Sequence, residues 1–279
     1  MNDTPFQSDT GREFHYSRQA HHLVVSRPSD GVVLVELANP ERRNAMSMLM
    51  TAAWQQLIAE LAVDPSVRCV AITGQGTSFC SGGDTGWIGS EPDASIGRLR
   101  ARMIPFYRTW LAIRQLEVPV LAGINGPAVG AGACLALAAD VRVASTSARF
   151  SVPFLSLGMH PGMATTFLLP EVVGVAAARD LLFTGRTAVA EEMSRLGLVS
   201  QVWEPSDFER NFIDLATQVA AKAPFATRLT KAALRDGGFS SLEDSIRWEA
   251  LAQPVTLAGA DLVEGLAAAR ERRAPRFGS

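Results

Sequence analysis

Two glycine-rich stretches of this 279-residue chain have the residue types that could bind a negatively charged oxygen. The first is Phe79–Asp84 and the second is Asn125–Cys134, and each follows an apolar run typical of a buried strand. The second stretch leads directly into an Ala/Leu-rich helix that ends near Asp140. Such junctions leave backbone N–H groups without partners, and these groups can hold a developing negative oxygen. Together the two stretches look like the two halves of an oxyanion hole for a thioester.

Composition and charge limit the other classes of function. A net charge of −2 gives no electrostatic reason to expect a nucleic acid or an anionic membrane surface as partner. No run of about 18 apolar residues without charge is present, so we expect no membrane-spanning segment. The three cysteines, Cys69, Cys80 and Cys134, lack the spacing of metal ligands, so no metal site is expected. Their odd number and apolar surroundings favour reduced thiols in a cytoplasmic protein.

The pattern of elements predicts an α/β fold with a parallel-sheet core. A hairpin is expected from Leu23–Ser26 and Val32–Leu37, followed by a helix over 46–63 that Asn44 or Ser47 would cap. The segment 91–116 is expected to be mostly helical, although Pro105 should kink or interrupt it.

Beyond Val173 almost every segment is predicted to be helical. We divide the chain into a flexible N-terminal arm at 1–20, a core at 21–200 and a C-terminal helical region at 201–279. The last region is short and rich in alanine, so it is expected to pack on partner subunits rather than to bury a core of its own.

In their order and spacing these motifs resemble the crotonase, or enoyl-CoA hydratase/isomerase, superfamily. The match includes residues 39–45, Phe79–Asp84, Val120–Asp140 and Phe150–Gly162, and it continues to Phe277. The resemblance implies a crotonase-like ββα superhelix core, a C-terminal helical trimerisation region, and a homotrimer or a hexamer built from two trimers. It also implies an acyl-CoA thioester as substrate, so that coenzyme A enters as part of the substrate and no cofactor is bound permanently.

The resemblance also assigns roles to individual residues. The backbone N–H groups of Gly83 and Ala131 would hold the thioester carbonyl. Two segments would line the coenzyme A site, and a basic residue of the final helix would reach its phosphates. The residues assigned in this way are Arg42, Arg43, Ala45, Ser81, Gly83, Asp84 and Arg273. An acyl pocket could be walled by Trp87, Trp110, Phe154, Met163 and Phe167, although aromatic residues at such positions more often belong to the core.

The chain departs from the family pattern at the two glutamates that hydratases use as acid and base, which correspond to Cys134 and Phe154. Each such group typically contributes about 10²–10⁴ in rate, so simple hydration is not expected. His160 is the candidate proton carrier, since histidine titrates near ~6.5. The alternative is a loop histidine bonded to the backbone. For Cys134 we expect an inert buried residue rather than a nucleophile.

We therefore expect an acyl-CoA-processing enzyme of this family, a lyase or isomerase that stabilises a thioester enolate with two backbone amides. Isomerisation, C–C cleavage, decarboxylation and thioester hydrolysis all remain open. One alternative is a non-catalytic acyl-CoA-binding protein that kept the pocket and lost the chemistry. The other is a hydrolase of a non-CoA diketone.

Overall fold

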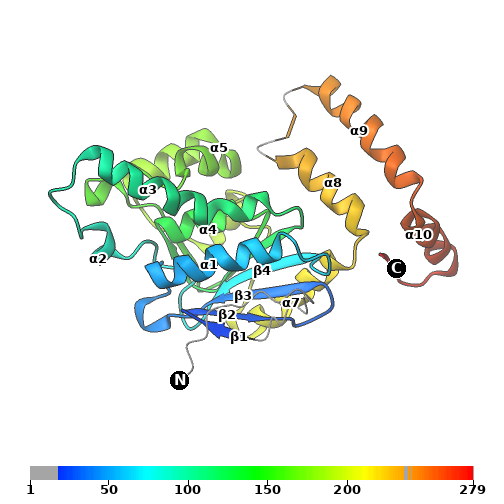
Figure 1. The fold of residues 1–279 in the computed structure, drawn as a ribbon, viewed down its shortest axis with the longest axis horizontal. Coiled ribbons are helices and arrows are strands. Elements are labelled where there is room, and N and C mark those ends of the chain that lie inside the picture. The colour runs from blue at the N-terminus through cyan, green and yellow to red at the C-terminus, as the bar shows by residue number, and fades with distance from the viewer. Residues whose placement is uncertain (1–17, 236–237, 240, 279) are drawn as a thin grey trace.

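The computed structural model describes residues 18–235, 238–239 and 241–278, and within these residues the chain folds around a seven-stranded mixed sheet (Figure 1). The strands lie in the spatial order β1-β2-β3-β4-β5-β7-β10. The pairs β1–β2 and β2–β3 are antiparallel, and every pair from β3–β4 onward is parallel. The strands are β1 (Arg18–Ala20), β2 (Leu23–Ser26), β3 (Val32–Leu37), β4 (Cys69–Gly74), β5 (Val120–Ile124), β7 (Val141–Ser145) and β10 (Gln201–Trp203).

A smaller sheet stands beside the main one in the order β6-β8-β9, with β6 and β8 parallel and β8 and β9 antiparallel. Its strands are β6 (Pro127–Val129), β8 (Arg149–Ser151) and β9 (Ala188–Val189). Because β6 lies inside the second glycine-rich stretch, this sheet fixes the position from which the following helix starts.

The helices cover both faces of the main sheet, with α1, α3 and α4 on one side and α7 on the other (Figure 1). They are α1 (Met48–Leu61), α2 (Thr85–Ile88), α3 (Ile96–Leu111), α4 (Ala131–Ala138), α5 (Thr165–Thr184), α6 (Ala190–Arg195), α7 (Pro205–Ala220), α8 (Pro224–Leu234), α9 (Leu242–Leu257) and α10 (Ala260–Glu271). Short 3₁₀ turns occur at Pro40–Arg42, Ala112–Gln115 and Leu155–Leu157. Helix α5 is broken at Gly174, whose φ of 76° and ψ of 160° are not helical.

Side chains of β3 alternate between two apolar clusters, which explains its continuous apolar sequence. Val33 and Val35 join the larger core beneath α1, α3 and α4. Val32 and Leu34 join a smaller cluster on the opposite face, where Phe212 of α7 packs. The predicted hairpin is confirmed over β2 and β3, and Ser47 rather than Asn44 caps α1, accepting a bond from the Met50 amide at 3.2 Å.

The structure corrects two details of the predicted elements. Pro105 does not interrupt α3, because it lies on the exposed side of the helix, where water can solvate the carbonyl of Ala101 that loses its partner. The region beyond Val173 is mostly helical, as predicted, but Ala188–Val189 and Gln201–Trp203 form the short strands β9 and β10. Both strands are short and depend on pairing with β8 and β7, so the local sequence pattern gave no signal for them.

The C-terminal helices α8, α9 and α10 project from the core on the side opposite α2 (Figure 1). At the N-terminal end, Arg18–Ala20 forms a strand paired with β2, while residues 1–17 of the predicted arm lie outside the described residues.

The two glycine-rich stretches pack against each other backbone to backbone. A Cβ atom added at Gly132 would lie 2.2 Å from the Cys80 carbonyl oxygen, and one added at Gly82, where φ is +97°, would lie 2.7 Å from the Val129 carbonyl oxygen. Contacts this short leave room for hydrogen only, so glycine is required at both positions.

We expect Gly132→Ala to lower the free energy of unfolding by about 1–3 kcal/mol or more, because the new methyl group would overlap backbone that cannot rotate away. The matched control is Gly97→Ala in α3, where nothing lies within 4 Å of the added Cβ. That control is expected to stabilise the protein by about 0.5–1 kcal/mol through helix propensity. Urea denaturation of both variants checks this, and equal stabilities would contradict the proposed backbone contact.

Candidate active site

A cavity of about 170 Å³ lies where the two glycine-rich stretches meet. It is lined by Gly83 from the first stretch, by Ala131 at the start of α4 and by His160 from the loop before α5. The structure thus brings together the three residues that the sequence singled out for catalysis.

Hydrogen bonds join the two stretches in parallel and set the spacing between them. The Cys80 amide donates to the Pro127 carbonyl at 3.1 Å, and the Val129 amide donates to the Cys80 carbonyl at 2.9 Å. This short ladder places Gly82 beside the Ala131 amide nitrogen, which would lie 3.2 Å from a Cβ at Gly82. The two stretches therefore meet at the wall of the cavity, which both Gly83 and Ala131 line.

Within the part of the chain that the structure describes, the N–H groups of Gly83 and Ala131 have no hydrogen-bond acceptor. Ala131 is the first residue of α4, so its N–H has no acceptor within the helix. Among the hydrogen bonds of the described residues, none is donated by the Gly83 or the Ala131 amide. Two unengaged amides at one cavity, one of them at the positive end of a helix, form an environment suited to a negative oxygen.

The segment around Arg42 runs alongside the first glycine-rich stretch. The Met46 amide donates to the Gly82 carbonyl at 2.8 Å, and the Ser81 amide donates to the Arg43 carbonyl at 2.9 Å. The exposed Arg42 guanidinium pairs with Asp84 at 3.0 Å. Five residues predicted for the coenzyme A site thus lie on adjoining loops, together with Gly83: Arg42, Arg43, Ala45, Ser81 and Asp84.

Asn44 has a structural function that sequence reasoning missed. Its side chain is fully buried, and the amide nitrogen donates to the carbonyls of Gln75, Ser78 and Phe79 at 2.9, 2.8 and 3.3 Å. Its φ of 56° is left-handed, a conformation that asparagine tolerates better than most residues. Asn44 therefore fixes the backbone that leads into the first glycine-rich stretch. In the sequence it stood out only as a loop asparagine that could cap the next helix.

Arg273 does not join the cavity within the same chain. It follows α10, on the opposite side of the molecule from α2, and its guanidinium pairs with Glu264 and Glu271. The six residues of the coenzyme A prediction other than Arg273 are thus brought together, and Arg273 is not.

Cys134 and Phe154 occupy the two positions at which the resemblance places glutamates. The Cys134 thiol is fully buried, lies 2.8 Å from the Thr165 hydroxyl and donates to the Gly130 carbonyl at 3.1 Å. Burial raises the pKa of this thiol to about 12. Phe154 lines the cavity, and its ring lies against Gly130.

His160 is exposed, and its Nδ1 lies 2.8 Å from the Pro161 carbonyl oxygen. A carbonyl oxygen only accepts, so Nδ1 carries the hydrogen in this bond and Nε2 is left as the basic nitrogen. This bond is the one expected if His160 is a loop histidine bonded to the backbone. The same bond also orients the ring at the edge of the cavity.

The walls of the cavity are mostly apolar and aromatic. Of the five residues predicted as wall, Trp87, Phe154 and Met163 line the cavity. Trp110 instead stacks on Trp54 in the core with ring centres 4.7 Å apart. Phe167, the fifth, is about half exposed on α5 outside the cavity.

Tyr107 of α3 was not predicted from the sequence as a site residue. Together with His160 it is a titratable side chain that lines this cavity. Burial raises the pKa of its phenol, and the neighbouring Cys134 adds to that shift. Its position depends on how α3 packs over the loop before α5, which sequence periodicity does not reveal.

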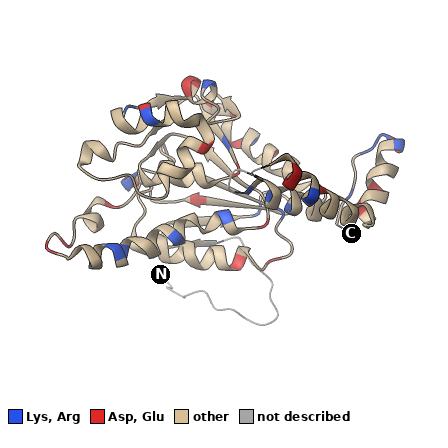
Figure 2. Ribbon diagram, turned by 90° about the horizontal axis from the view of Figure 1, so that it is seen from above, with Lys and Arg blue, Asp and Glu red and all other residues tan. Residues whose placement is uncertain are grey.

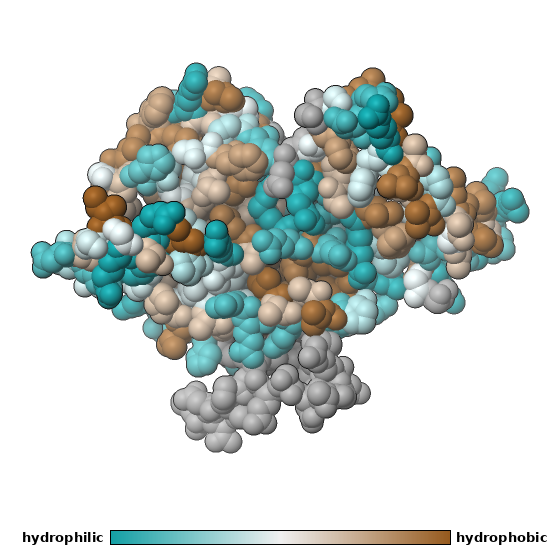
Figure 3. Space-filling view, turned by 45° about the horizontal axis from the view of Figure 1, so that its top comes forward, coloured by the Kyte–Doolittle hydropathy of each residue, from teal (hydrophilic) through white to brown (hydrophobic). Residues whose placement is uncertain are grey.

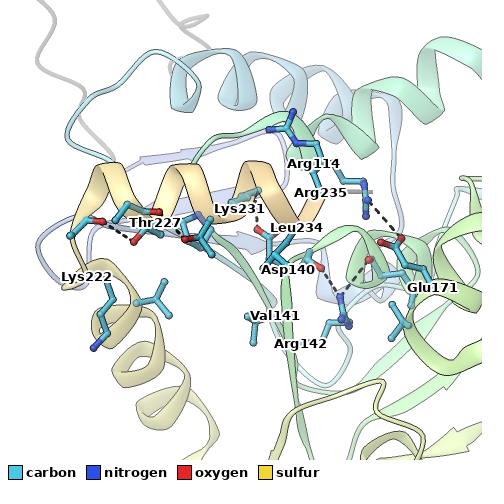
Figure 4. A pocket seen from close by; sticks show the side chains of 18 of the residues that line it. Arg114, Asp140, Val141, Arg142, Glu171, Lys222, Thr227, Lys231, Leu234 and Arg235 are labelled. Atoms are coloured by element: carbon cyan, nitrogen blue, oxygen red, sulfur yellow. Dashed lines mark hydrogen bonds and ion pairs between the residues drawn. The ribbon is translucent and has the colours of Figure 1, made fainter. Parts of the chain in front are cut away.

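A larger cavity of about 810 Å³ lies between α8 and the core, away from the glycine-rich stretches. Figure 4 shows Lys231 reaching from α8 to Asp140, where the ion pair measures 2.7 Å. Arg142 donates to the carbonyls of Ala139 and Leu198, which end α4 and precede β10. These charged groups already bind one another or the backbone, so we assign the cavity a structural function in seating α8.

Charge and metal ligands give no further candidate. Figure 2 shows basic and acidic residues interspersed along the ribbon. Across the described ranges, no cluster of three or more His, Cys, Asp or Glu side chains could hold a metal ion. Nor is any helix in that part of the chain long and apolar enough to cross a membrane.

The chain is similar to known proteins in both sequence and structure. A model of the family described as enoyl-CoA hydratase/isomerase matches residues 27–279. A probable enoyl-CoA hydratase of Mycobacterium leprae is 35% identical over 95% of this chain and 93% of its own length. The 1,2-epoxyphenylacetyl-CoA isomerase of Escherichia coli is 31% identical over 91% of this chain and 98% of its own. A crystal structure of a putative enoyl-CoA hydratase from Streptomyces coelicolor superposes with a TM-score of 0.87 at 35% identity, covering 99% of each chain.

We expect the three cysteines to resist alkylation in the folded protein, because burial raises the pKa of the Cys69, Cys80 and Cys134 thiols to about 12. Iodoacetamide at about pH 8 should label none of them until denaturant is added, and then all three. Mass spectrometry of the labelled peptides checks this. Rapid labelling of native Cys134 would show that its thiol is ionisable at the cavity after all.

Proposed function

Because this chain belongs to the enoyl-CoA hydratase/isomerase family, we propose that it binds an acyl-CoA thioester and stabilises its enolate through the Gly83 and Ala131 amides. The family resemblance and the crotonase-like α/β fold expected from the motifs are confirmed. The relatives are named as hydratase, isomerase and dehalogenase, so this is a family of enzymes whose reactions differ.

One observation carries the proposal: Gly83 and Ala131 line one cavity, and among the described residues neither of their amides donates a hydrogen bond. A thioester becomes acidic at its α-carbon only if the enolate oxygen is stabilised. Preformed N–H donors do this without reorganisation, and removing one donor typically costs about 10²–10³ in rate. The α4 N-terminus adds its positive potential to the same place.

The reaction proposed here is not simple hydration. Neither the buried Cys134 thiol nor the Phe154 ring can replace a carboxylate as acid or base. His160, with Nε2 as its basic nitrogen, is the proposed proton carrier at the cavity edge. Isomerisation, C–C cleavage and decarboxylation each pass through an enolate, whereas thioester hydrolysis passes through a tetrahedral oxyanion formed when water adds to the carbonyl. The two proposed donors would stabilise the negative oxygen in either case, and His160 would move the proton.

Coenzyme A would lie along the loops that carry Arg42, Arg43 and Ser81, with no cofactor bound permanently. Arg273 would contribute from a neighbouring subunit. Figure 3 shows hydrophobic residues gathered over the C-terminal helices. Among the apolar side chains of these helices, Leu242 is 78% exposed. A surface of this kind supports the proposed homotrimer or hexamer. We also keep a cytoplasmic location as part of the proposal, on the evidence of the free cysteines.

Replacing Ala131 by proline removes one proposed donor while retaining the helix, because proline is favoured at the first helical position. We expect turnover of an active acyl-CoA to fall about 10²–10³-fold with native circular dichroism. Ile96→Pro makes the same change at the first residue of α3, whose side chain is exposed and does not line the cavity, and should leave turnover unchanged. If both variants are equally active, the Ala131 amide is not a donor to the transition state.

His160→Ala tests the proposed proton carrier. Loss of a general acid or base should lower the turnover number by about 10²–10⁴ without a matching loss of acyl-CoA affinity. Steady-state kinetics alongside calorimetric binding separates the two quantities. Full turnover by the variant on every active acyl-CoA would end this assignment.

Two outcomes of a screen with acyl-CoA thioesters would favour the alternatives. Binding without any product, judged by mass spectrometry, would indicate an acyl-CoA-binding protein, which the missing carboxylates at Cys134 and Phe154 would then explain. No affinity for coenzyme A or its thioesters would favour a hydrolase of a non-CoA diketone.

A further inference from the structure

The hydroxyl group of Tyr107 occupies the space directly above Gly162, at the cavity that Gly83 and Ala131 line. A Cβ atom added at Gly162 would lie 2.5 Å from the Tyr107 hydroxyl oxygen. Only glycine leaves room for the phenol at this point. The chain thus brings a polar side chain from α3 against the loop before α5, across the cavity wall.

The hydroxyl group has no partner within the described part of the protein. None of the hydrogen bonds among those residues includes it. It is also absent from the fully enclosed polar atoms without partners, so the oxygen is open to the cavity. A phenol of this kind is free to bond to whatever enters.

Burial raises the pKa of the Tyr107 phenol, with a smaller contribution from Cys134, so the group keeps its proton at neutral pH. It can therefore donate a hydrogen bond. Its neighbours on the cavity wall are the aromatic side chains of Trp87, Phe106 and Phe154. None of these side chains offers an oxygen acceptor that would compete with the bound group for the phenol hydrogen.

The helix that carries Tyr107 is held firmly, which gives the hydroxyl a fixed position. Phe106 packs edge-to-face on Tyr107 with ring centres 6.2 Å apart. One turn further, Trp110 stacks on Trp54 and donates to the Thr51 hydroxyl at 3.1 Å. A donor on a packed helix loses little freedom when it binds, so it can discriminate between ligands.

The cavity of about 170 Å³ is smaller than the roughly 300–1,000 Å³ of sites that enclose drug-sized ligands. With a thioester carbonyl at the amides, only the acyl end of a substrate fits inside. The hydroxyl of Tyr107 therefore faces acyl atoms close to the thioester rather than the coenzyme A portion.

We propose that Tyr107 is a specificity-determining residue that donates a hydrogen bond to an oxygen on the acyl group, so that the site selects hydroxy- or oxo-substituted acyl thioesters. This inference rests on the proposed function, since it requires an acyl-CoA in the cavity. An acyl group without such an oxygen leaves the phenol unpaired, and sites built around a hydrogen bond reject ligands that lack it.

The test is calorimetric titration with three four-carbon thioesters: butanoyl-CoA, 2-hydroxybutanoyl-CoA and 3-hydroxybutanoyl-CoA. The unsubstituted protein should bind one hydroxy thioester about 3- to 10-fold more tightly than butanoyl-CoA. Tyr107→Phe should abolish this preference while its affinity for butanoyl-CoA stays the same. Thr109→Val, which removes a hydroxyl from the same helix outside the cavity, should keep the preference.

Equal affinity of the unsubstituted protein for all three thioesters, or a preference that survives in Tyr107→Phe, overturns the inference and leaves the proposed function standing. Absence of binding by every thioester overturns the proposed function as well. Near-ultraviolet circular dichroism establishes that Tyr107→Phe is folded, and retained butanoyl-CoA affinity shows that its cavity is intact.

Discussion

The packing of one glycine-rich loop on the other, backbone against backbone, determines the geometry of the candidate site. Gly132 and Gly82 approach carbonyl oxygens of the opposite stretch too closely for any side chain. The hydrogen bonds from Cys80 and Val129 fix how far each loop advances along the other. As a result, Gly83 and Ala131, from segments almost fifty residues apart, line one cavity, and a change in this contact would separate them.

The remaining elements support that contact. Buried Asn44 holds the approach to the first loop through three carbonyls. The strand β6, inside the second stretch, pairs with β8 and so fixes the point where α4 begins. Asp84 accepts a bond from the Trp87 amide at 3.0 Å and starts the short helix α2, which forms one wall of the cavity. Rigid donors of this kind stabilise charge because they are already oriented before the substrate arrives.

Much of the fold could be predicted from the sequence because its signals are local. The apolar runs of β2 and β3 and the proline and glycine boundaries of the helices are readable without any tertiary contact. The strands β9 and β10 were not, since two or three residues carry no periodicity and depend on partners elsewhere in the chain. In the site, the family resemblance of the motifs was needed to single out Gly83, Ala131 and His160. Tyr107 and Asn44 depend on packing between distant segments, and neither spacing nor composition reveals such packing.

The central claim is that the Gly83 and Ala131 amides bind one oxygen of a thioester. A crystal structure of the protein with a bound acyl-CoA tests it most directly. The account predicts that the thioester carbonyl oxygen lies about 2.7–3.1 Å from both amide nitrogens. A carbonyl oxygen placed away from either amide, or amides turned to bond with the protein itself, would contradict it.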